Sequence, residues 1–220
     1  MKRLIAVISC HSYQYPSQDE GAAHHSGLNS QRSRAIRDTW YKNWQQKYRS
    51  EIDLKFFLGR DRRHTPEENE IFLDCDDDYY SLPRKVQMTF QWALEHGYSD
   101  VIKIDDDVWC YVERLLRNFQ STEYKGFVLE SISGRYTSGT AYWLNCKAMQ
   151  VIADAEWNPV DWAEDKWVGK TLAAYGIHPE HDERYQCCHC PDCAKKFPKD
   201  SRITTHLINP REMYELMEKN

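Results

Sequence analysis

The sequence has no hydrophobic run long enough to cross a membrane. Its first apolar run, residues 4–8, is far shorter than the roughly 20 residues that a spanning helix needs. Lys2 and Arg3 precede this run as they would in a signal peptide, but no small-residue cleavage site follows it. We therefore interpret residues 4–9 as a buried strand and expect a soluble, cytoplasmic protein.

An excess of positive charge is also missing. The chain of 220 residues has 29 Lys and Arg against 34 Asp and Glu, which gives a net charge of −5. Proteins that bind nucleic acid usually gather Lys and Arg into a basic surface, so this balance argues against that class. No Gly-rich phosphate loop of the GxGxxG or GxxxxGK type is present, which argues against simple dinucleotide and P-loop chemistry.

Strands and helices alternate in the first half of the chain. The pattern predicts strands at residues 4–9, 53–58 and 101–104, with helices at about 31–48 and from Ser81 or Leu82 onward. Further strands are predicted at 127–130 and 141–144, and further helices at 112–119, 147–155, 165–175 and after Asn209. This order predicts an α/β fold with a mainly parallel, mixed sheet and helices on both faces. Ligands of such sheets bind beyond the carboxyl ends of the strands.

Three consecutive aspartates, Asp105, Asp106 and Asp107, follow the strand predicted at 101–104. Alternate side chains of a strand share a face, so we expect Asp105 and Asp107 to point the same way and Asp106 to point opposite. Two neighbouring carboxylates repel each other unless a cation lies between them, and a hard divalent cation prefers oxygen ligands. The triplet thus predicts a metal site, although an acidic surface turn would have the same sequence.

Five short motifs stand in a fixed order along the chain. They are RAIRDTW at residues 34–40, FFLG at 56–59, DDYYSLPRK at 77–85, KIDDDV at 103–108 and EDKWVG at 164–169. Each is similar to a motif of the β-1,3-galactosyltransferase-like family, the β3-glycosyltransferases, with Lys166 in place of that family's usual valine. The sequence resembles this family over roughly residues 1–180.

The resemblance implies a GT-A fold for a single domain over residues 1–220, a UDP-sugar donor, a Mn²⁺ (or Mg²⁺) ion and inversion at the anomeric carbon. A divalent ion on Asp105 and Asp107 would offset the negative charge that develops on the leaving diphosphate. Inversion by direct displacement also needs a general base for the acceptor hydroxyl. The matched motif gives that role to Asp165, with Glu164 as the competitor. An ordinary acidic residue in the first turn of a helix is the alternative interpretation of Asp165.

The resemblance places further residues around the donor. Arg34, Arg37 and Lys85 are expected on the nucleotide side, where Asp105 and Asp106 also count as donor-binding residues. Surface or structural ion pairing is the alternative for the three basic residues. His206 is the candidate for the C-terminal histidine that often completes the metal shell of GT-A enzymes, although an isolated histidine is usually structural.

Aromatic side chains supply a candidate acceptor wall. Tyr142, Trp143 and Trp162 are the candidates, with core packing as the alternative for each. The acceptor itself stays open between a sugar in a glycan or glycolipid and a hydroxyl on a modified base of viral DNA, which the net negative charge disfavours. Most family members carry a membrane anchor, and none is visible here, which points to a bacterial or viral enzyme acting in a cytoplasm.

A dense cluster of cysteines departs from the family pattern. Its metal-ligating residues are Cys187, Cys188, His189, Cys190 and Cys193, within a Cys/His-rich insertion at about 178–205. The two CxxC spacings are typical of zinc knuckles, so we expect a structural Zn²⁺, which His178 or His181 could also ligate. Reduced thiols without metal are the alternative. A non-catalytic zinc-containing binding module on a degenerate transferase scaffold is the rival function, and the intact Asp105, Asp107 and Asp165 argue against it.

Overall fold

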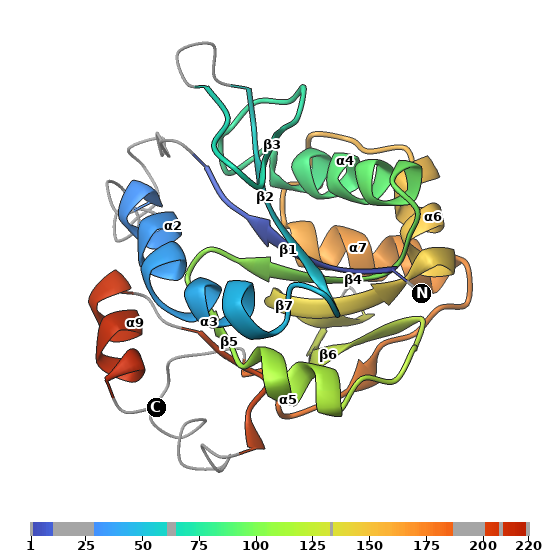
Figure 1. Ribbon diagram of the computed structural model, residues 1–220. Coiled ribbons are helices and arrows are strands. Elements are labelled where there is room, and N and C mark those ends of the chain that lie inside the picture. The colour runs from blue at the N-terminus through green and yellow to red at the C-terminus, as the bar shows by residue number, and fades with distance from the viewer. Residues whose placement is uncertain are drawn as a thin grey trace.

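A computed structural model describes residues 2–10, 29–60, 65–132, 134–186, 201–206 and 209–218 of this chain. A seven-stranded sheet lies at the centre in the order β3-β2-β1-β4-β7-β6-β8, and helices cover both of its faces (Figure 1). A separate two-stranded sheet joins β5 to β9. The predicted α/β class and the layered arrangement are confirmed.

Parallel strands form one half of the sheet. They are β1 (Lys2–Ile8), β2 (Asp53–Leu58), β3 (Glu70–Phe72) and β4 (Tyr98–Asp105). On the other side of β4, β7 (Gly134–Asn145) and β6 (Tyr124–Ser131) run antiparallel, and β8 (Glu180–His181) pairs parallel with β6. The sheet is therefore mixed: β7 runs opposite to both of its neighbours, and β6 and β8 run in the same direction as β4.

Two apolar cores lie on the two faces of this sheet. In β1, Ile5 and Val7 join one core, while Leu4, Ala6 and Ile8 join the other, so both faces of the strand are buried. A central strand buried on both sides is expected to be continuously hydrophobic, as residues 4–8 are.

The helices divide between these cores. Helices α4 (Leu82–Glu95), α6 (Cys146–Asp154) and α7 (Glu164–Ala174) cover one face. Helices α2 (Asn29–Asp38), α3 (Trp40–Lys47), α5 (Val112–Arg117) and α9 (Pro210–Met217) lie on the other (Figure 1). The structure describes no helix that is long and apolar enough to cross a membrane.

The helix predicted at 31–48 is interrupted, which is a correction. Thr39 lies between α2 and α3, and its hydroxyl donates a 2.6 Å hydrogen bond to the Ala35 carbonyl. Trp40 is buried, and its indole N–H donates to the Val108 carbonyl at 3.2 Å. The Thr-Trp pair of the first motif therefore ties the turn between two helices to the segment that follows the aspartates.

The parallel strands end together near the aspartate triplet. Ile8 of β1 is the register partner of Asp105 of β4, so Ser9 lies beside Asp106. The short strand β5 (Val108–Cys110) starts just after the triplet and pairs with β9 (Thr204–His206), with Val108 opposite His206. The carboxyl edge of the sheet thus collects side chains that are about 100 residues apart in the sequence.

Candidate active site

The aspartate triplet turns away from the sheet after its first residue. Strand β4 ends at Asp105, and residues 106 and 107 form a turn. The expected alternation of side chains along a strand therefore stops at Asp105, and the prediction that Asp106 points opposite to Asp107 is wrong. A single guanidinium, that of Arg32, lies 3.8 Å from an Asp106 oxygen and 3.5 Å from an Asp107 oxygen.

Arg32 is a residue that the sequence analysis missed. Its side chain is buried, and it is the cation that the structure places against the two aspartates. Arg32 lies four residues before Ile36, which is in the core, so the two residues share one face of the predicted helix. A charged residue on that buried face was the signal that could have identified it. Burial of an arginine requires a carboxylate partner, which the triplet provides.

Arg34 and Arg37 lie elsewhere. The Arg34 side chain is 81% exposed and pairs with Asp38 along the same helix. Arg37 forms a 2.7 Å ion pair with Glu70 of β3 and stacks over the Phe56 ring at 4.0 Å. In the described residues, both arginines thus make the surface and structural ion pairs that were the alternative to nucleotide binding.

His206 reaches the aspartates through the small sheet. Its Nε2 lies 3.2 Å from an Asp107 oxygen, and β9 holds it opposite Val108. Burial of the ring disfavours its charged form, but the hydrogen bond to Asp107 and the charges of Asp107 and Asp105 outweigh this and raise the pKa of His206. The predicted proximity of this histidine to the triplet is therefore observed.

Burial and the charges of neighbouring carboxylates raise the pKa values of two aspartates of the triplet. Burial, and next the charge of Asp107, raise the pKa of Asp106 to about 7, although Arg32 and the Ser9 hydroxyl oppose the shift. Burial also raises the pKa of Asp105, opposed by Lys103 and reinforced by Asp107. An additional cation would relieve this repulsion.

Oxygen donors with one imidazole suit Mn²⁺ or Mg²⁺ in kind. In the described part of the chain, no group of three His, Cys, Asp or Glu side chains is already arranged around one point as a metal site requires. Asp107 and His206 are in contact, and Asp105 adds its charge to theirs. These three residues therefore suit a divalent ion by the kind of their donor atoms, and two of them, Asp107 and His206, are already in contact.

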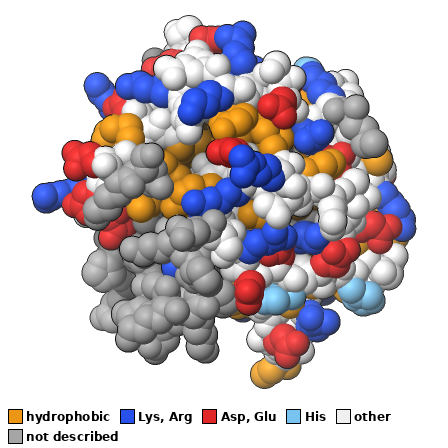
Figure 2. Space-filling view, turned by 60° about the horizontal axis from the view of Figure 1, so that its bottom comes forward, with side chains coloured by type: hydrophobic (Ala, Val, Ile, Leu, Met, Phe, Trp, Pro, Cys, Tyr) orange, Lys and Arg blue, Asp and Glu red, His pale blue; other side chains and the backbone are white. Residues whose placement is uncertain are grey.

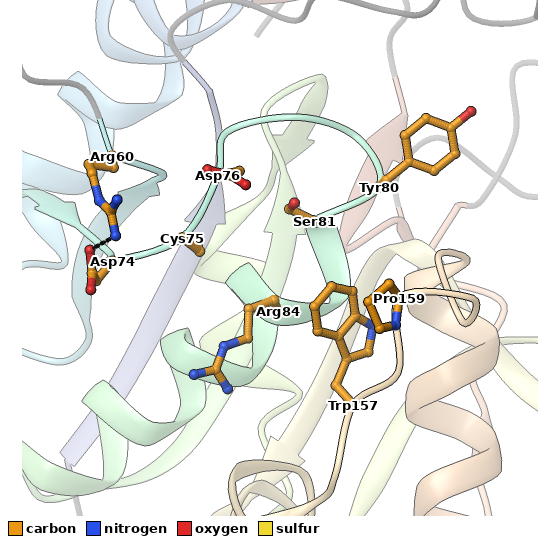
Figure 3. A pocket seen from close by; sticks show the side chains of 9 residues that line it. All are labelled: Arg60, Asp74, Cys75, Asp76, Tyr80, Ser81, Arg84, Trp157 and Pro159. Atoms are coloured by element: carbon orange, nitrogen blue, oxygen red, sulfur yellow. Dashed lines mark hydrogen bonds and ion pairs between the residues drawn. The ribbon is translucent and has the colours of Figure 1, made fainter.

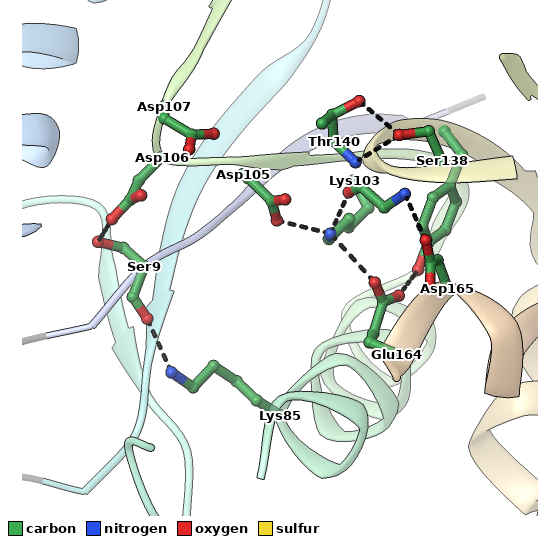
Figure 4. A network of polar contacts seen from close by, with 12 residues as sticks. Ser9, Lys85, Lys103, Asp105, Asp106, Asp107, Ser138, Thr140, Glu164 and Asp165 are labelled. Atoms are coloured by element: carbon green, nitrogen blue, oxygen red, sulfur yellow. Dashed lines mark hydrogen bonds and ion pairs between the residues drawn. The ribbon is translucent and has the colours of Figure 1, made fainter. Parts of the chain in front are cut away.

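A buried lysine connects the triplet to the start of α7. Lys103 on β4 is fully buried, and its ammonium lies 2.6 Å from an Asp105 oxygen and 3.3 Å from a Glu164 oxygen (Figure 4). It also donates a hydrogen bond to the Gly139 carbonyl. Burial disfavours the ammonium, but the two carboxylates outweigh this and raise the pKa of Lys103. The positive charge of Lys103 therefore lies between Asp105 and Glu164 and holds both carboxylates in position.

Glu164 is enclosed by this network. It is buried, and the Tyr142 hydroxyl donates a hydrogen bond to it. Burial raises the pKa of Glu164 to about 7, Lys103 opposes the shift, and the charge of Asp165 adds to it. A carboxylate fixed in this way has little freedom to reach a substrate.

Asp165 is the more accessible of the two acids. It is half-buried, and one of its oxygens lies 3.3 Å from the Gly139 backbone N–H, which donates to it (Figure 4). A Cβ on Gly139 would lie 3.1 Å from a Glu164 oxygen and 3.4 Å from the Asp165 Cβ, so only glycine leaves both acids undisturbed. The close approach of β7 to the start of α7 thus fixes the position of Asp165.

Lys85 is buried behind the triplet rather than exposed to a ligand. Its ammonium donates to the Ser9 carbonyl at 2.8 Å and to Asp77, and the Ser9 hydroxyl donates to Asp106 at 2.8 Å. Asp77 in turn accepts from the Gly59 backbone N–H at 2.7 Å. The second and third motifs therefore meet in one polar network, which holds the segment after β3 against the strand ends.

Replacing Gly59 with Ala should destabilise the protein. The new Cβ would lie 2.7 Å from the Asp77 Cβ and 2.8 Å from its Cα, so the backbone of that segment would have to move. Crowding of this kind in a packed region costs about 1–3 kcal/mol. Chemical denaturation should show a lower midpoint with an unchanged slope. An unchanged midpoint would mean that Asp77 is not held in the position described.

The aromatic candidates separate into two kinds. Tyr142 and Trp143 are buried, and both join the cores, so packing is the observed role of these two. Trp162 is 43% exposed and lies with its ring 5.9 Å from Tyr79 and 6.1 Å from Tyr80. Burial, and then the charges of Asp105, Asp165 and Glu164, raise the pKa of Tyr79, which places this aromatic group beside the acids.

The cysteine cluster lies outside the described residues. This applies to Cys187, Cys188, His189, Cys190 and Cys193. Beside the cluster, His181 uses its Nδ1 to accept a hydrogen bond from the Val128 backbone N–H at 3.1 Å, which leaves only Nε2 for a metal. The structural Zn²⁺ stays a prediction.

Comparison with known protein families gives a match over part of the chain. Residues 31–127 match the galactosyltransferase family. The predicted resemblance is confirmed. The matched segment contains four of the five motifs and includes the triplet, whereas the Glu164–Asp165 motif lies beyond it. No protein in the curated set matches the chain.

One solved structure shares the architecture over nearly its whole length. A glycosyltransferase involved in the glycosylation of the major capsid of PBCV-1 superimposes with a TM-score of 0.52 at 15% identity, covering 98% of this chain and 99% of that one. A protein from Desulfovibrio desulfuricans G20, described as a nucleotide-diphospho-sugar transferase, has a TM-score of 0.48 at 15% identity over 83% and 80% of the two chains. The fold of this galactosyltransferase-like chain is of the GT-A type, and family match and fold together support a glycosyltransferase.

Proposed function

We propose that the chain is a metal-dependent, inverting glycosyltransferase of the β-1,3-galactosyltransferase-like kind. It moves a hexose or N-acetylhexosamine from a UDP-sugar to a hydroxyl of a glycan. The observation that carries this proposal is the meeting, at one edge of the sheet, of the Asp105–Asp107–His206 group with the Glu164–Asp165 pair on either side of buried Lys103. A donor site and a base site within one constellation are what direct displacement requires.

Asp105, Asp107 and His206 would hold a Mn²⁺ or Mg²⁺ ion. When bound, the ion supplies Lewis-acid stabilisation of the charge on the departing diphosphate. Arg32, which lies 3.8 Å from an Asp106 oxygen and 3.5 Å from an Asp107 oxygen, holds these two carboxylates in place and offsets part of their mutual repulsion. Lys85 acts indirectly. It is buried, and its hydrogen bonds hold Ser9 and Asp77 in position.

Asp165 takes the part of the base. An acceptor oxygen forms a bond to the anomeric carbon, the bond from that carbon to the diphosphate oxygen breaks, and UDP leaves with the electron pair. The proton of the acceptor hydroxyl goes to a carboxylate oxygen of Asp165. Accessibility favours Asp165 over Glu164, because Asp165 is half-buried whereas Glu164 is buried and held by Lys103 and Tyr142.

The acceptor enters beside the aromatic group formed by half-buried Tyr79 and the exposed Tyr80 and Trp162. These rings lie next to the acids and present apolar faces of the kind that stack on sugar rings. On the described part of the face seen in Figure 2, Lys and Arg side chains lie among Asp and Glu side chains, an arrangement that does not favour a nucleic-acid acceptor.

A panel of UDP-sugars tests the function before the acceptor is known. Each donor is incubated with the protein and Mn²⁺ without acceptor, and release of UDP by slow hydrolysis is measured. One or two donors should be hydrolysed, and chelation of the metal should stop the reaction. The Asp107→Asn variant, purified in parallel, controls for contaminating hydrolases. If no donor is hydrolysed and titration calorimetry detects no UDP binding with Mn²⁺, the proposal is rejected.

A further inference from the structure

A pocket of about 540 Å³ lies beside the candidate active site, apart from the acids and the aspartate triplet. Its walls come from four segments: the residues just after β2, the residues between β3 and α4, the first turn of α4, and the loop from α6 to α7. The lining residues are Arg60, Asp74, Cys75, Asp76, Tyr80, Ser81, Arg84, Trp157 and Pro159 (Figure 3). This volume is within the range of about 300–1,000 Å³ found for small-molecule sites.

Charges in the pocket are balanced. Two arginines, Arg60 and Arg84, stand against two aspartates, Asp74 and Asp76, and Arg60 pairs with Asp74. Arg84 donates a 2.6 Å hydrogen bond to Gln87. An anionic ligand would meet the two carboxylates and a cationic one the two guanidinium groups. An uncharged ligand with many hydroxyl groups can use both donors and acceptors.

The rest of the lining is aromatic or inert. Tyr80 and Trp157 provide ring surfaces, and the Trp157 indole N–H is fixed by a 3.3 Å hydrogen bond to the Asp161 carbonyl. Cys75 is buried, and this burial raises the pKa of its thiol to about 11, so the thiol is not a nucleophile near neutral pH. Flat apolar rings bordered by polar groups are suited to binding a sugar rather than to catalysing a reaction on it.

The pocket and the proposed acceptor entrance share one residue, Tyr80. Tyr80 lines the pocket and also contacts Trp162, whose other neighbour is Tyr79 beside the acids. The loop that carries Trp157 and Pro159 continues through Trp162 directly into Glu164 and Asp165 at the start of α7. The pocket is therefore joined to the proposed acceptor entrance through Tyr80 and through the loop that leads to Asp165.

We propose that this pocket binds a neutral hexose or N-acetylhexosamine unit of an oligosaccharide acceptor, at a distance from the unit that receives the transferred sugar. The proposal rests on the proposed function, and it defines the acceptor as an oligosaccharide of uncharged sugars rather than a monosaccharide. Trp157 and Tyr80 stack on the distal unit, and the Arg and Asp side chains bond its hydroxyl groups.

Binding measured without a donor sugar tests this inference. The probes are neutral tetrasaccharides of hexose and N-acetylhexosamine, the corresponding monosaccharides, and a tetrasaccharide that contains uronic acid. Calorimetry or saturation-transfer NMR is run with the whole chain, with and without UDP and Mn²⁺. At least one neutral tetrasaccharide should bind more tightly than its monosaccharides, and Trp157→Ala should weaken it at least about 10-fold. Trp157→Phe should retain part of the binding, and Arg60→Gln, at an exposed side chain, should weaken it without affecting the fold.

A matched control is Tyr175→Ala, which removes an exposed aromatic ring at the far end of α7 and should change nothing. The inference is overturned if no neutral tetrasaccharide binds, if Trp157→Ala and Arg60→Gln bind as the parent does, or if the uronate probe binds best. If the protein hydrolyses a donor but binds no oligosaccharide, the subsite is rejected and the transferase function stands. If the protein binds an oligosaccharide but hydrolyses no donor, the transferase function is rejected instead.

Discussion

Replacing Asp107 with Asn should abolish the metal-dependent part of UDP binding. Asp107 is buried and lies 3.2 Å from His206 and 3.5 Å from Arg32, so its charge is the centre of the proposed donor site. Asn keeps the shape and removes the charge that a divalent ion needs. Loss of residues outside the ligand shell already costs about 10–100-fold in metal affinity, so loss of a ligand should cost at least about 100-fold. Calorimetric titration of UDP, with and without Mn²⁺, measures the effect.

Asp106→Asn is the matched control for this experiment. Asp106 accepts from Ser9 and has a pKa raised to about 7, so a neutral side chain resembles a state that the native residue already populates near neutral pH. Its effect on UDP binding should be milder. Equal losses in both variants would mean that the turn as a whole, rather than a ligand at position 107, determines binding.

A second measurement separates a local effect from unfolding. The pKa of His206 is raised, against the effect of burial, by Asp107 first and Asp105 next. Removing the Asp107 charge should therefore move the titration of the His206 ring to lower pH, which NMR can follow in the metal-free protein. If the titration does not move, the contact between these two residues is absent in solution.

The architecture could be predicted because it depends on local patterns. Continuous apolar runs marked β1 and β4, and helical spacing in 82–95 marked α4, since each needs only its own residues to be recognised. Strand β7 was longer than predicted because residues 134–140, which are rich in Gly, Ser and Thr, lack an apolar alternation. Their strand conformation comes from pairing with β6, and this is a long-range effect.

The site was predictable only in part, for a related reason. The motif residues Asp105, Asp107 and Glu164 and the separate candidate His206 do lie near one another, but the contacts that join them do not appear in any local pattern. Lys103 reads as one polar residue in an apolar strand, and its partner Glu164 lies 61 residues away. Likewise, the turn after Asp105 depends on Arg32 and Ser9, which hold Asp106 from two other elements. Charge pairs across a fold are set by packing, which a single sequence does not display.

Replacing Asp165 with Asn should lower transfer by roughly 10²-fold or more while UDP-sugar binding is retained. The side chain stays similar in shape, but it can no longer take the acceptor proton. One oxygen of Asp165 accepts from the Gly139 N–H and the other from the Lys166 N–H, and because Asn has only one oxygen, losing one of these bonds should cost about 1 kcal/mol of stability, which thermal unfolding can check. Single-turnover transfer and equilibrium binding, measured on the same preparation, separate the chemical step from binding.

Glu164→Gln is the comparison that decides between the two acids. Glu164 contacts Lys103 and Tyr142 in a buried network, so its replacement should weaken folding and shift Asp165, with a smaller loss of transfer. If Asp165→Asn transfers near the parent rate and Glu164→Gln does not, the base is Glu164. In that case transfer by the parent enzyme should also rise with pH through about 7, because burial raises the pKa of Glu164 to about 7 and a base must first lose its proton. Asp165 as the base requires that the Glu164→Gln variant retain most of its transfer rate.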